Sequence, residues 1–163
     1  MFHVKQNSYE VIVLGGGHAG VEAAVAASRI GAKTALITFN LSDLGAMSCN
    51  PAMGGLGKGH IIREIDALGG VMGVASDSAG IQFRMLNRTK GEAVRGPRAQ
   101  IDRNLYKKNI QTILRNEKVR IIEGEVIDVR LHRNKKKIKS IELLTGTRLY
   151  CNSFVVTSGT FLN

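Results

Sequence analysis

The sequence of 163 residues lacks the features that mark secreted and membrane proteins. No apolar run approaches the roughly 18–20 residues that a membrane helix needs, so we expect no spanning segment. Residues 1–6 lack the basic and then apolar layout of a secretory signal peptide. These absences favour a cytoplasmic protein with no membrane partner.

Cysteine and histidine are also scarce. The two cysteines, Cys49 and Cys151, lie far apart and form neither a disulfide framework nor a CxxC pair. The four histidines are scattered, so the sequence predicts no metal site. Two isolated cysteines fit a reducing cytosol, where thiols stay free.

Acidic residues are the minority charge. The chain has 23 Lys and Arg against 13 Asp and Glu, a net charge of +10. The stretch from Arg84 to Arg120, here called the basic segment, holds eleven basic and three acidic residues and so carries +8 of that charge. It is either a solvated face or a surface for a polyanion such as tRNA. Because few aromatic residues are interleaved, the sequence favours backbone contact over base stacking.

The residues that are present follow the pattern of an α/β protein. Hydrophobic residues make up 44% and charged residues 22%, as in soluble globular proteins, and the length fits one domain. An apolar run over 9–14, a glycine turn, an alanine-rich segment over 21–30 and a second apolar run over 33–38 predict strand, helix and strand. Together they form one βαβ unit.

The rest of the chain predicts further elements around a long loop. Residues 40–59 form a glycine-rich loop of a length that is usually functional. Residues 69–96 show no assignable pattern. The expected later elements are helices over 58–68 and 98–115, strands over 119–122, 126–131, 138–144 and 148–151 that include a meander, and a last parallel strand over 154–159.

The glycine turn carries a dinucleotide-binding pattern, Gly15-x-Gly17-x-x-Gly20, after a strand and at a helix start. Gly15 permits the tight turn, Gly17 lets the backbone approach a pyrophosphate, and Gly20 allows close packing of helix on strand. The helix N-terminus then offers N–H groups to phosphates. A purely structural glycine turn is the alternative.

Two departures separate this pattern from a simple NAD domain. The acid expected about 20 residues on is missing, since the second strand ends in Thr38-Phe39-Asn40 and the nearest acid is Asp43. Asn40 offers ribose a hydrogen bond without charge. The inserted meander is typical of the FAD-binding half of glutathione-reductase-like flavoproteins. The predicted fold is therefore a Rossmann-like α/β FAD-binding domain with a parallel sheet and an inserted β-meander, incomplete in this chain.

Three longer stretches are more distinctive than the glycine turn. They are Leu44-Gly45-Ala46-Met47-Ser48-Cys49-Asn50-Pro51-Ala52-Met53-Gly54-Gly55-Leu56-Gly57-Lys58-Gly59-His60, Gly80-Ile81-Gln82-Phe83-Arg84-Met85-Leu86-Asn87 and Gly159-Thr160-Phe161-Leu162. From about Tyr9 to its last residue, the chain resembles the MnmG (GidA) family of tRNA wobble-uridine modification enzymes. Its length implies the N-terminal part of the flavin domain, with the remaining family domains and the second family cysteine beyond Asn163.

The resemblance implies a flavoenzyme that binds FAD and takes electrons from NADH, whose site would lie outside this chain. With a GTPase partner, MnmE, it would add an aminomethyl-type group at C5 of the tRNA wobble uridine, using carbon from a tetrahydrofolate donor. A homodimer within a heterotetramer is implied as well. The residues that match the family's FAD contacts are Gly15, Gly16, Gly17, His18, Ala19, Gly20 and Val126.

Cys49 matches the family cysteine proposed to take part in the chemistry. As a thiolate it can add to C6 of a pyrimidine and make C5 reactive; the alternative is a small buried apolar residue. Two other functions also remain open. One is a flavin- or NAD-dependent oxidoreductase that acts on a small molecule, and the other is an RNA-binding module that keeps a nucleotide-binding fold without catalysis.

Overall fold

The computed structural model describes residues 7–48, 50–133 and 136–159 of the chain. These residues form two compact units. The first, here called the six-stranded unit, comprises residues 1–44 and 114–163, and the second, the three-stranded unit, comprises residues 45–113. The glycine turn belongs to the first unit, and much of the basic segment belongs to the second.

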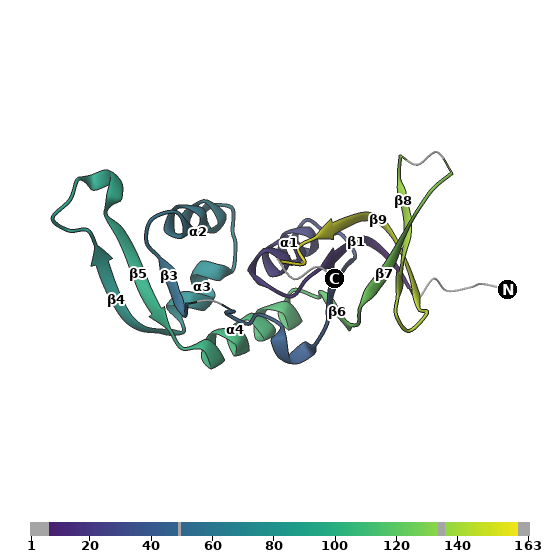
Figure 1. The fold of residues 1–163 in the computed structure, drawn as a ribbon, viewed down its shortest axis with the longest axis horizontal. Helices are drawn as coiled ribbons and strands as arrows, with labels where there is room; N and C mark the ends of the chain where they lie inside the picture. Colours follow the sequence, from purple (N-terminus) through teal and green to yellow (C-terminus); the bar gives the residue numbers. More distant parts are fainter. Residues whose placement is uncertain (1–6, 49, 134–135, 160–163) are drawn as a thin grey trace. The chain divides into compact units, whose positions relative to one another are not determined.

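The six-stranded unit has one sheet of strand order β6-β2-β1-β9-β8-β7 (Figure 1). Its elements are β1 (Ser8–Leu14), α1 (His18–Arg29), β2 (Thr34–Thr38), the 3-10 helix η1 (Leu41–Asp43), β6 (Arg120–Glu123), β7 (Val126–Leu131), β8 (Ile138–Leu143) and β9 (Arg148–Val156). The strands β6, β2, β1 and β9 are parallel, and β7 and β8 continue the sheet in antiparallel pairs. The predicted parallel sheet with an inserted meander is confirmed.

Strand β9 joins the meander to the parallel sheet. The prediction of two separate strands, over 148–151 and 154–159, is wrong, because residues 148–156 form one strand. Its first half pairs with β8, with Ser140 opposite Tyr150, and the same strand pairs with β1 up to Val156 beside Leu14. The carboxyl end of β9 therefore reaches the glycine turn that follows β1.

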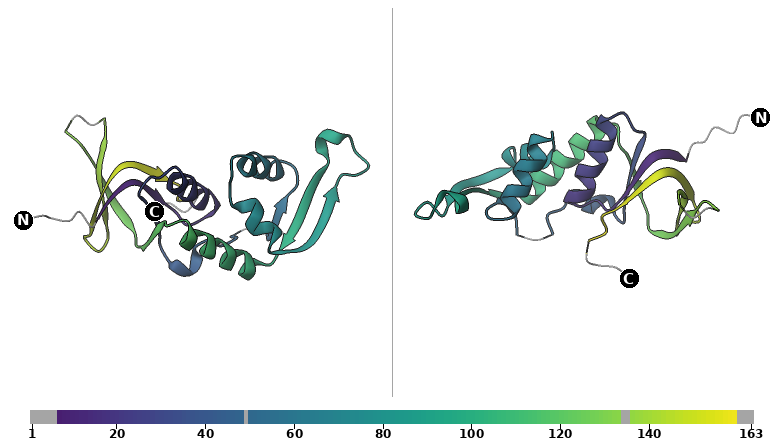
Figure 2. Two further views of the ribbon diagram at one scale, coloured as in Figure 1. Left: turned by 180° about the vertical axis from the view of Figure 1, so that it is seen from behind. Right: turned by 90° about the horizontal axis from the view of Figure 1, so that it is seen from above.

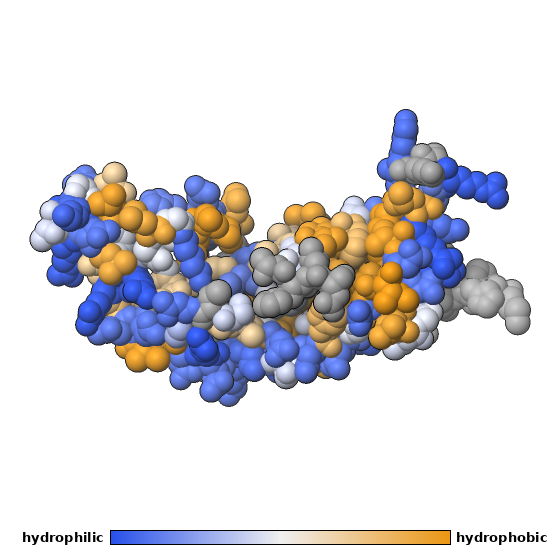
Figure 3. Space-filling view, in the orientation of Figure 1, coloured by the Kyte–Doolittle hydropathy of each residue, from blue (hydrophilic) through white to orange (hydrophobic). Residues whose placement is uncertain are grey.

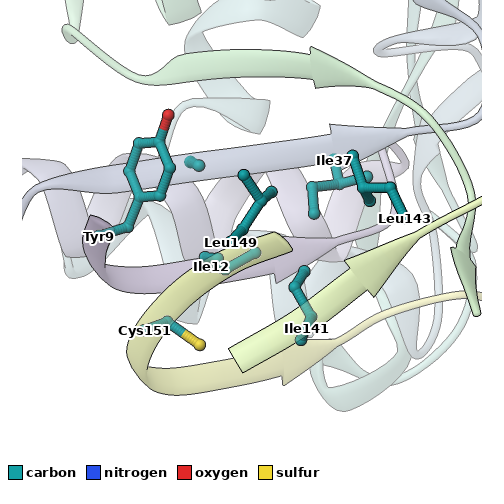
Figure 4. Packing of buried hydrophobic residues seen from close by; sticks show 8 residues of the cluster. Tyr9, Ile12, Ile37, Ile141, Leu143, Leu149 and Cys151 are labelled. Carbon is teal, nitrogen blue, oxygen red and sulfur yellow. The ribbon is translucent and has the colours of Figure 1, made fainter. Parts of the chain in front are cut away.

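A cluster of buried apolar residues holds this sheet together (Figure 4). Its members are Tyr9, Ile12, Ala35, Ile37, Ile141, Leu143, Leu149 and Cys151. They come from β1, β2, β8 and β9, so the cluster joins the parallel strands to the meander. Each fully buried aliphatic side chain contributes on the order of 1.5–3 kcal/mol. Helix α1 adds its own buried stripe, which includes Val21, Ala24 and Val25.

The three-stranded unit is built on an antiparallel sheet of order β3-β5-β4. Its elements are β3 (Ala52–Gly54), α2 (Lys58–Ala67), α3 (Met72–Asp77), β4 (Gly80–Leu86), the 3-10 helix η2 (Glu92–Val94), β5 (Gly96–Ile101) and most of α4 (Arg103–Asn116). Figure 2 shows the β4–β5 hairpin extending past α2 and α3. Helix α2 confirms the helix predicted over 58–68, whereas β3 lies inside the stretch predicted to be an irregular loop.

The helix predicted over 98–115 begins only at Arg103, so that prediction is wrong for its first five positions. Residues 98–101 belong to β5, where Arg98 pairs with Arg84 of β4. Asp102 then ends the strand and starts the helix, because its Oδ1 accepts hydrogen bonds from the N–H groups of Asn104 and Leu105, each at 2.9 Å. The buried positions of the helix are Tyr106, Ile110 and Leu114, one turn apart.

Among the residues that the structure describes, no helix is long and apolar enough to cross a membrane.

Candidate functional site

The glycine turn begins where β1 ends. The N–H of Gly15 donates to the Ile37 carbonyl at 2.8 Å, which ties the turn to the end of β2. Gly15 has a φ of 111°, a backbone conformation that residues with a side chain rarely adopt. The turn itself therefore requires the first glycine of the pattern.

The third glycine, Gly20, lies against the turn from within α1. A Cβ at Gly20 would overlap the Gly15 carbonyl oxygen and crowd the Thr157 Oγ1 atom. Thr157 follows β9, and its Oγ1 donates to the Leu14 carbonyl at 2.7 Å while its N–H donates to the same oxygen at 2.8 Å. The ends of β1, β9 and α1 thus pack together on these residues.

The second glycine, Gly17, is the N-cap of α1 and faces open space. Its φ of −77° is ordinary, and a Cβ added there would meet no atom within 4 Å. No side chain caps the helix, and the first intrahelical bond runs from the Val21 N–H to the Gly17 carbonyl at 3.0 Å. His18, Ala19 and Gly20 form the first turn, and the N–H groups of a first helical turn point out of the end of the helix.

This geometry fits a dinucleotide pyrophosphate. A helix N-terminus carries partial positive charge and N–H donors. Because Gly17 has no side chain, the space in front of this N-terminus is open. The first turn of α1 contains no acidic residue that would repel a phosphate. The arrangement can hold an anion through backbone groups alone, so it supplies binding and orientation rather than acid–base catalysis.

The end of β2, where the acid of a simple NAD domain is missing, lies at the same edge of the sheet. The Asn40 Oδ1 accepts from the Ser42 N–H at 2.8 Å and so caps η1. A carboxylate comes from a neighbouring strand instead. Glu123, at the end of β6, pairs in register with Thr38, and its Oε2 accepts from the Leu41 N–H at 3.2 Å. The sequence alone does not indicate Glu123, because only the pairing of β2 with β6 brings it to the end of β2.

Val126 lies near this edge as well. It is the first residue of β7, three positions beyond the end of β6, and it packs half-buried against the core cluster. The intervening Gly124 donates its N–H to the Thr38 carbonyl at 2.9 Å. Val126 therefore follows the carboxyl end of β6, which pairs with the end of β2, and Gly15 to Gly20 follow the carboxyl end of β1, the other neighbour of β2.

Of the two cysteines, the structure describes only Cys151. Cys49, the predicted catalytic residue, lies outside the described residues, and its neighbours Ser48 and Asn50 are exposed. Cys151 belongs to the core cluster, and burial raises the pKa of its thiol above the ordinary value. A thiol in that state is a poor nucleophile, so Cys151 serves the packing of the core.

His60, in the first turn of α2, has a structural contact. Its Nδ1 accepts from the Gly57 N–H at 3.3 Å, so the ring satisfies the backbone at the start of the helix. In the part of the chain that the structure describes, no three His, Cys, Asp or Glu side chains gather as metal ligands would.

Comparison with known proteins places most of the chain in one family. The family model described as "Glucose inhibited division protein A" matches residues 10–163. A curated relative from Zymomonas mobilis, named "tRNA uridine 5-carboxymethylaminomethyl modification enzyme MnmG", is 53% identical over 161 residues. That match covers 98% of this chain and 26% of the relative, so the chain spans about a quarter of the relative's length.

Solved structures agree in fold. GidA of Aquifex aeolicus superimposes with a TM-score of 0.91 at 46% identity, over 100% of this chain and 26% of that chain. A probable FAD-dependent monooxygenase of Pseudomonas aeruginosa, pqsL, superimposes with a TM-score of 0.64 at 17% identity, over 91% of this chain and 42% of that chain. The second likeness concerns the fold alone. The predicted Rossmann-like fold is thereby confirmed.

Proposed function

Because the chain belongs to the Glucose inhibited division protein A (GidA) family, we propose that it forms the flavin-binding part of an enzyme that modifies tRNA. The reaction would place a carboxymethylaminomethyl or aminomethyl group at C5 of the wobble uridine, as the name of the relative from Zymomonas mobilis indicates for that protein. The observation that carries the proposal is the open helix N-terminus in front of Gly17, which suits the pyrophosphate of FAD.

The FAD contacts would come from backbone groups at one edge of the sheet. Gly15, Gly16, Gly17, His18, Ala19 and Gly20 would hold the pyrophosphate, and Val126 would contact the nucleotide through its backbone. FAD, when bound, supplies the electron transfer that the modification requires. The residues of this chain would bind it and orient it, and Glu123 offers a carboxylate next to the end of β2.

Cys49 is the proposed nucleophile. Its thiolate would add to C6 of the uracil ring, which moves the C5–C6 electron pair to C5. C5 would then attack a one-carbon electrophile supplied by a tetrahydrofolate donor. Loss of the C5 proton and cleavage of the C6–S bond would return the thiolate. Cys151 is buried and does not compete for this role.

The remaining assignments follow from the family. NADH would be the reductant and MnmE the GTPase partner, in a cytoplasmic assembly that contains a homodimer. Two alternatives predict different combinations of ligands. A small-molecule oxidoreductase would bind flavin without tRNA, and an RNA-binding module would bind tRNA without flavin.

The test begins with the absorption spectrum of the purified full-length protein and the identity of any chromophore that denaturation releases. Released FAD together with salt-sensitive tRNA binding supports the proposal. A colourless protein that also fails to take up added FAD contradicts it. Cys49→Ser should then abolish tRNA modification while FAD stays bound, with Cys151→Ala as the matched control, and full activity of Cys49→Ser would exclude the nucleophile.

A further inference from the structure

One face of the sheet in the three-stranded unit carries paired arginines without counterions. Arg84 of β4 and Arg98 of β5 are opposite each other in the antiparallel register. Residues opposite each other across a ladder project to the same face, where like charges repel. Neither guanidinium has an ion pair or a hydrogen bond among the described residues, and the three strands contain no Asp or Glu.

The next pair along the same two strands is also polar. Gln82 is opposite Gln100, two residues from the arginines in each strand, so all four side chains share one face. Neither amide has a side-chain hydrogen bond to another described residue. The β3 residue opposite Arg98 is Gly54, which places no side chain beside the arginine. The result is a compact array of unused donors, two guanidinium groups and two amides.

The surroundings add positive charge and space. Arg84 and Arg98 also border a pocket of about 400 Å³, together with Arg63, Arg88 and Asp77. Figure 3 shows hydrophilic residues next to hydrophobic ones over the β4–β5 hairpin. Four arginines against one carboxylate give this pocket positive charge, while its lining also includes Phe83 and Ala99, which alternate with the array along β4 and β5.

We propose that this array, Gln82, Arg84, Arg98 and Gln100, binds an unpaired RNA nucleotide, with the arginine pair on a phosphodiester and the glutamine amides on the base edge. Paired guanidinium groups match the charge and the oxygen geometry of a phosphate. An amide offers a donor and an acceptor side by side, as the Watson–Crick edge of an unpaired base requires. The proposal rests on the proposed function, because it names where the RNA substrate would be held.

An acidic protein segment is the competing occupant of the arginine pair. Carboxylates would satisfy the guanidinium groups equally well. The glutamine pair favours RNA, because a base edge uses both the donor and the acceptor of an amide. The test distinguishes the two occupants by measuring the affinity of each variant for RNA.

The experiment measures binding of a fluorescent anticodon stem–loop RNA to full-length, FAD-loaded protein by anisotropy at several salt concentrations. Arg84→Ala and Arg98→Ala should each weaken binding at least about tenfold and reduce the salt slope by about 1. Arg84→Lys should bind the RNA more tightly than Arg84→Ala but less tightly than the unchanged protein. Lysine keeps the positive charge but lacks the two parallel N–H donors with which a guanidinium group binds a phosphate. Gln82→Met should weaken binding of the normal stem–loop but not of one with an abasic wobble position.

Two matched controls isolate this face. Arg115→Ala removes one charge from the basic segment outside the sheet, and Thr112→Val alters the exposed surface of α4 without changing the charge. Both should stay within about threefold of the unchanged protein. Because Arg84 and Arg98 repel each other in the free protein, Arg84→Ala should not lower the unfolding temperature, which distinguishes lost binding from lost folding.

Equal losses in Arg115→Ala and Arg84→Ala would overturn the proposal in favour of a diffuse electrostatic field. Unchanged RNA affinity in Arg84→Ala and Arg98→Ala, with reduced affinity for a protein partner, would overturn it in favour of an acidic protein segment. Failure of the proposed function looks different, since the unchanged protein would then bind neither FAD nor tRNA. FAD occupancy should be normal in every variant of this face.

Discussion

The backbone of Gly20 in α1 lies against the carbonyl group of Gly15, so that a methyl group on Gly20 would overlap the carbonyl oxygen. This contact places the start of the helix directly over the end of β1. A Cβ added at Gly17, between them in the sequence, would contact no atom within 4 Å, so the helix N-terminus is open. The glycines of one motif therefore have different roles. Gly20 allows the helix to pack against the turn, and Gly17 leaves room for a ligand at the helix N-terminus.

Substitution of the two glycines should separate folding from cofactor binding. Gly17→Ala should keep the free energy of unfolding within about 1 kcal/mol of the unchanged protein and reduce FAD occupancy at least tenfold, because the methyl group fills the space that a pyrophosphate needs. Gly20→Ala should lose FAD and also about 1–3 kcal/mol of stability through overpacking. Urea unfolding and the ratio of flavin to protein absorbance measure the two effects.

Gly91→Ala is the matched control, because a Cβ added at Gly91 would meet no atom within 4 Å and Gly91, the N-cap of η2, belongs to the other unit. It should change neither stability nor FAD occupancy. Normal FAD occupancy in Gly17→Ala would contradict a pyrophosphate site at this helix. Normal stability in Gly20→Ala would contradict the packing role.

The sequence predicts the βαβ unit, the meander and the glycine turn because each depends on local signals. Apolar runs, alanine content and glycine spacing specify these elements without distant partners. The contacts at the site that could not be predicted from the sequence join residues far apart in the chain. Thr157 bonds to Leu14 across 143 positions of the chain, and Glu123 reaches Leu41 across 82. Only the pairing of β1 with β9 and of β2 with β6 brings them together.

The missed part of the fold has a similar cause. Residues 69–96 contain a six-residue helix, a 3-10 helix and one strand of the three-stranded antiparallel sheet, and β3 has only three residues, too few for a periodic signal. Arg98 to Ile101 pair with β4, and this tertiary pairing overrides a local sequence that also suits a helix. The array of Arg84 and Arg98 depends on the same pairing, so composition showed the charge of the basic segment without its arrangement.

Thr157 should stabilise the turn through its hydroxyl group. Thr157→Val removes the 2.7 Å hydrogen bond to the Leu14 carbonyl while keeping the shape of the side chain. We expect the free energy of unfolding in urea to fall by about 0.5–1.5 kcal/mol. FAD should also bind less tightly, because one of the hydrogen bonds that fix the end of β9 against β1 is lost. Thr112→Val removes a 3.0 Å bond on the exposed surface of α4 and should cost less. Equal costs would argue against a special role for Thr157.

Glu123 should contribute to cofactor affinity if it replaces the missing acid at the end of β2. Glu123→Gln keeps the size and removes the charge, so a hydrogen bond from a ribose hydroxyl would weaken. We expect FAD to bind about five- to tenfold less tightly, a difference near 1 kcal/mol, by titration of the apoprotein. Glu125→Gln is the control, because Glu125 follows two residues later and contributes only its backbone carbonyl, to Leu144. Similar affinities in both variants would leave Glu123 with a local role at Leu41.

Cys151 should make stability depend on pH in the alkaline range. Burial raises the pKa of its thiol above the ordinary value of 9.0, so the folded protein keeps a proton that the unfolded chain releases. Stability from this group is complete below the unfolded pKa and declines as the pH rises past about 9, by at most about 1.4 kcal/mol per pH unit. Cys151→Ala loses packing at every pH but lacks this decline. Urea unfolding at pH 7.5 and 10 should therefore show a smaller loss in Cys151→Ala than in the unchanged protein, and equal losses would mean that the buried thiol does not resist ionisation.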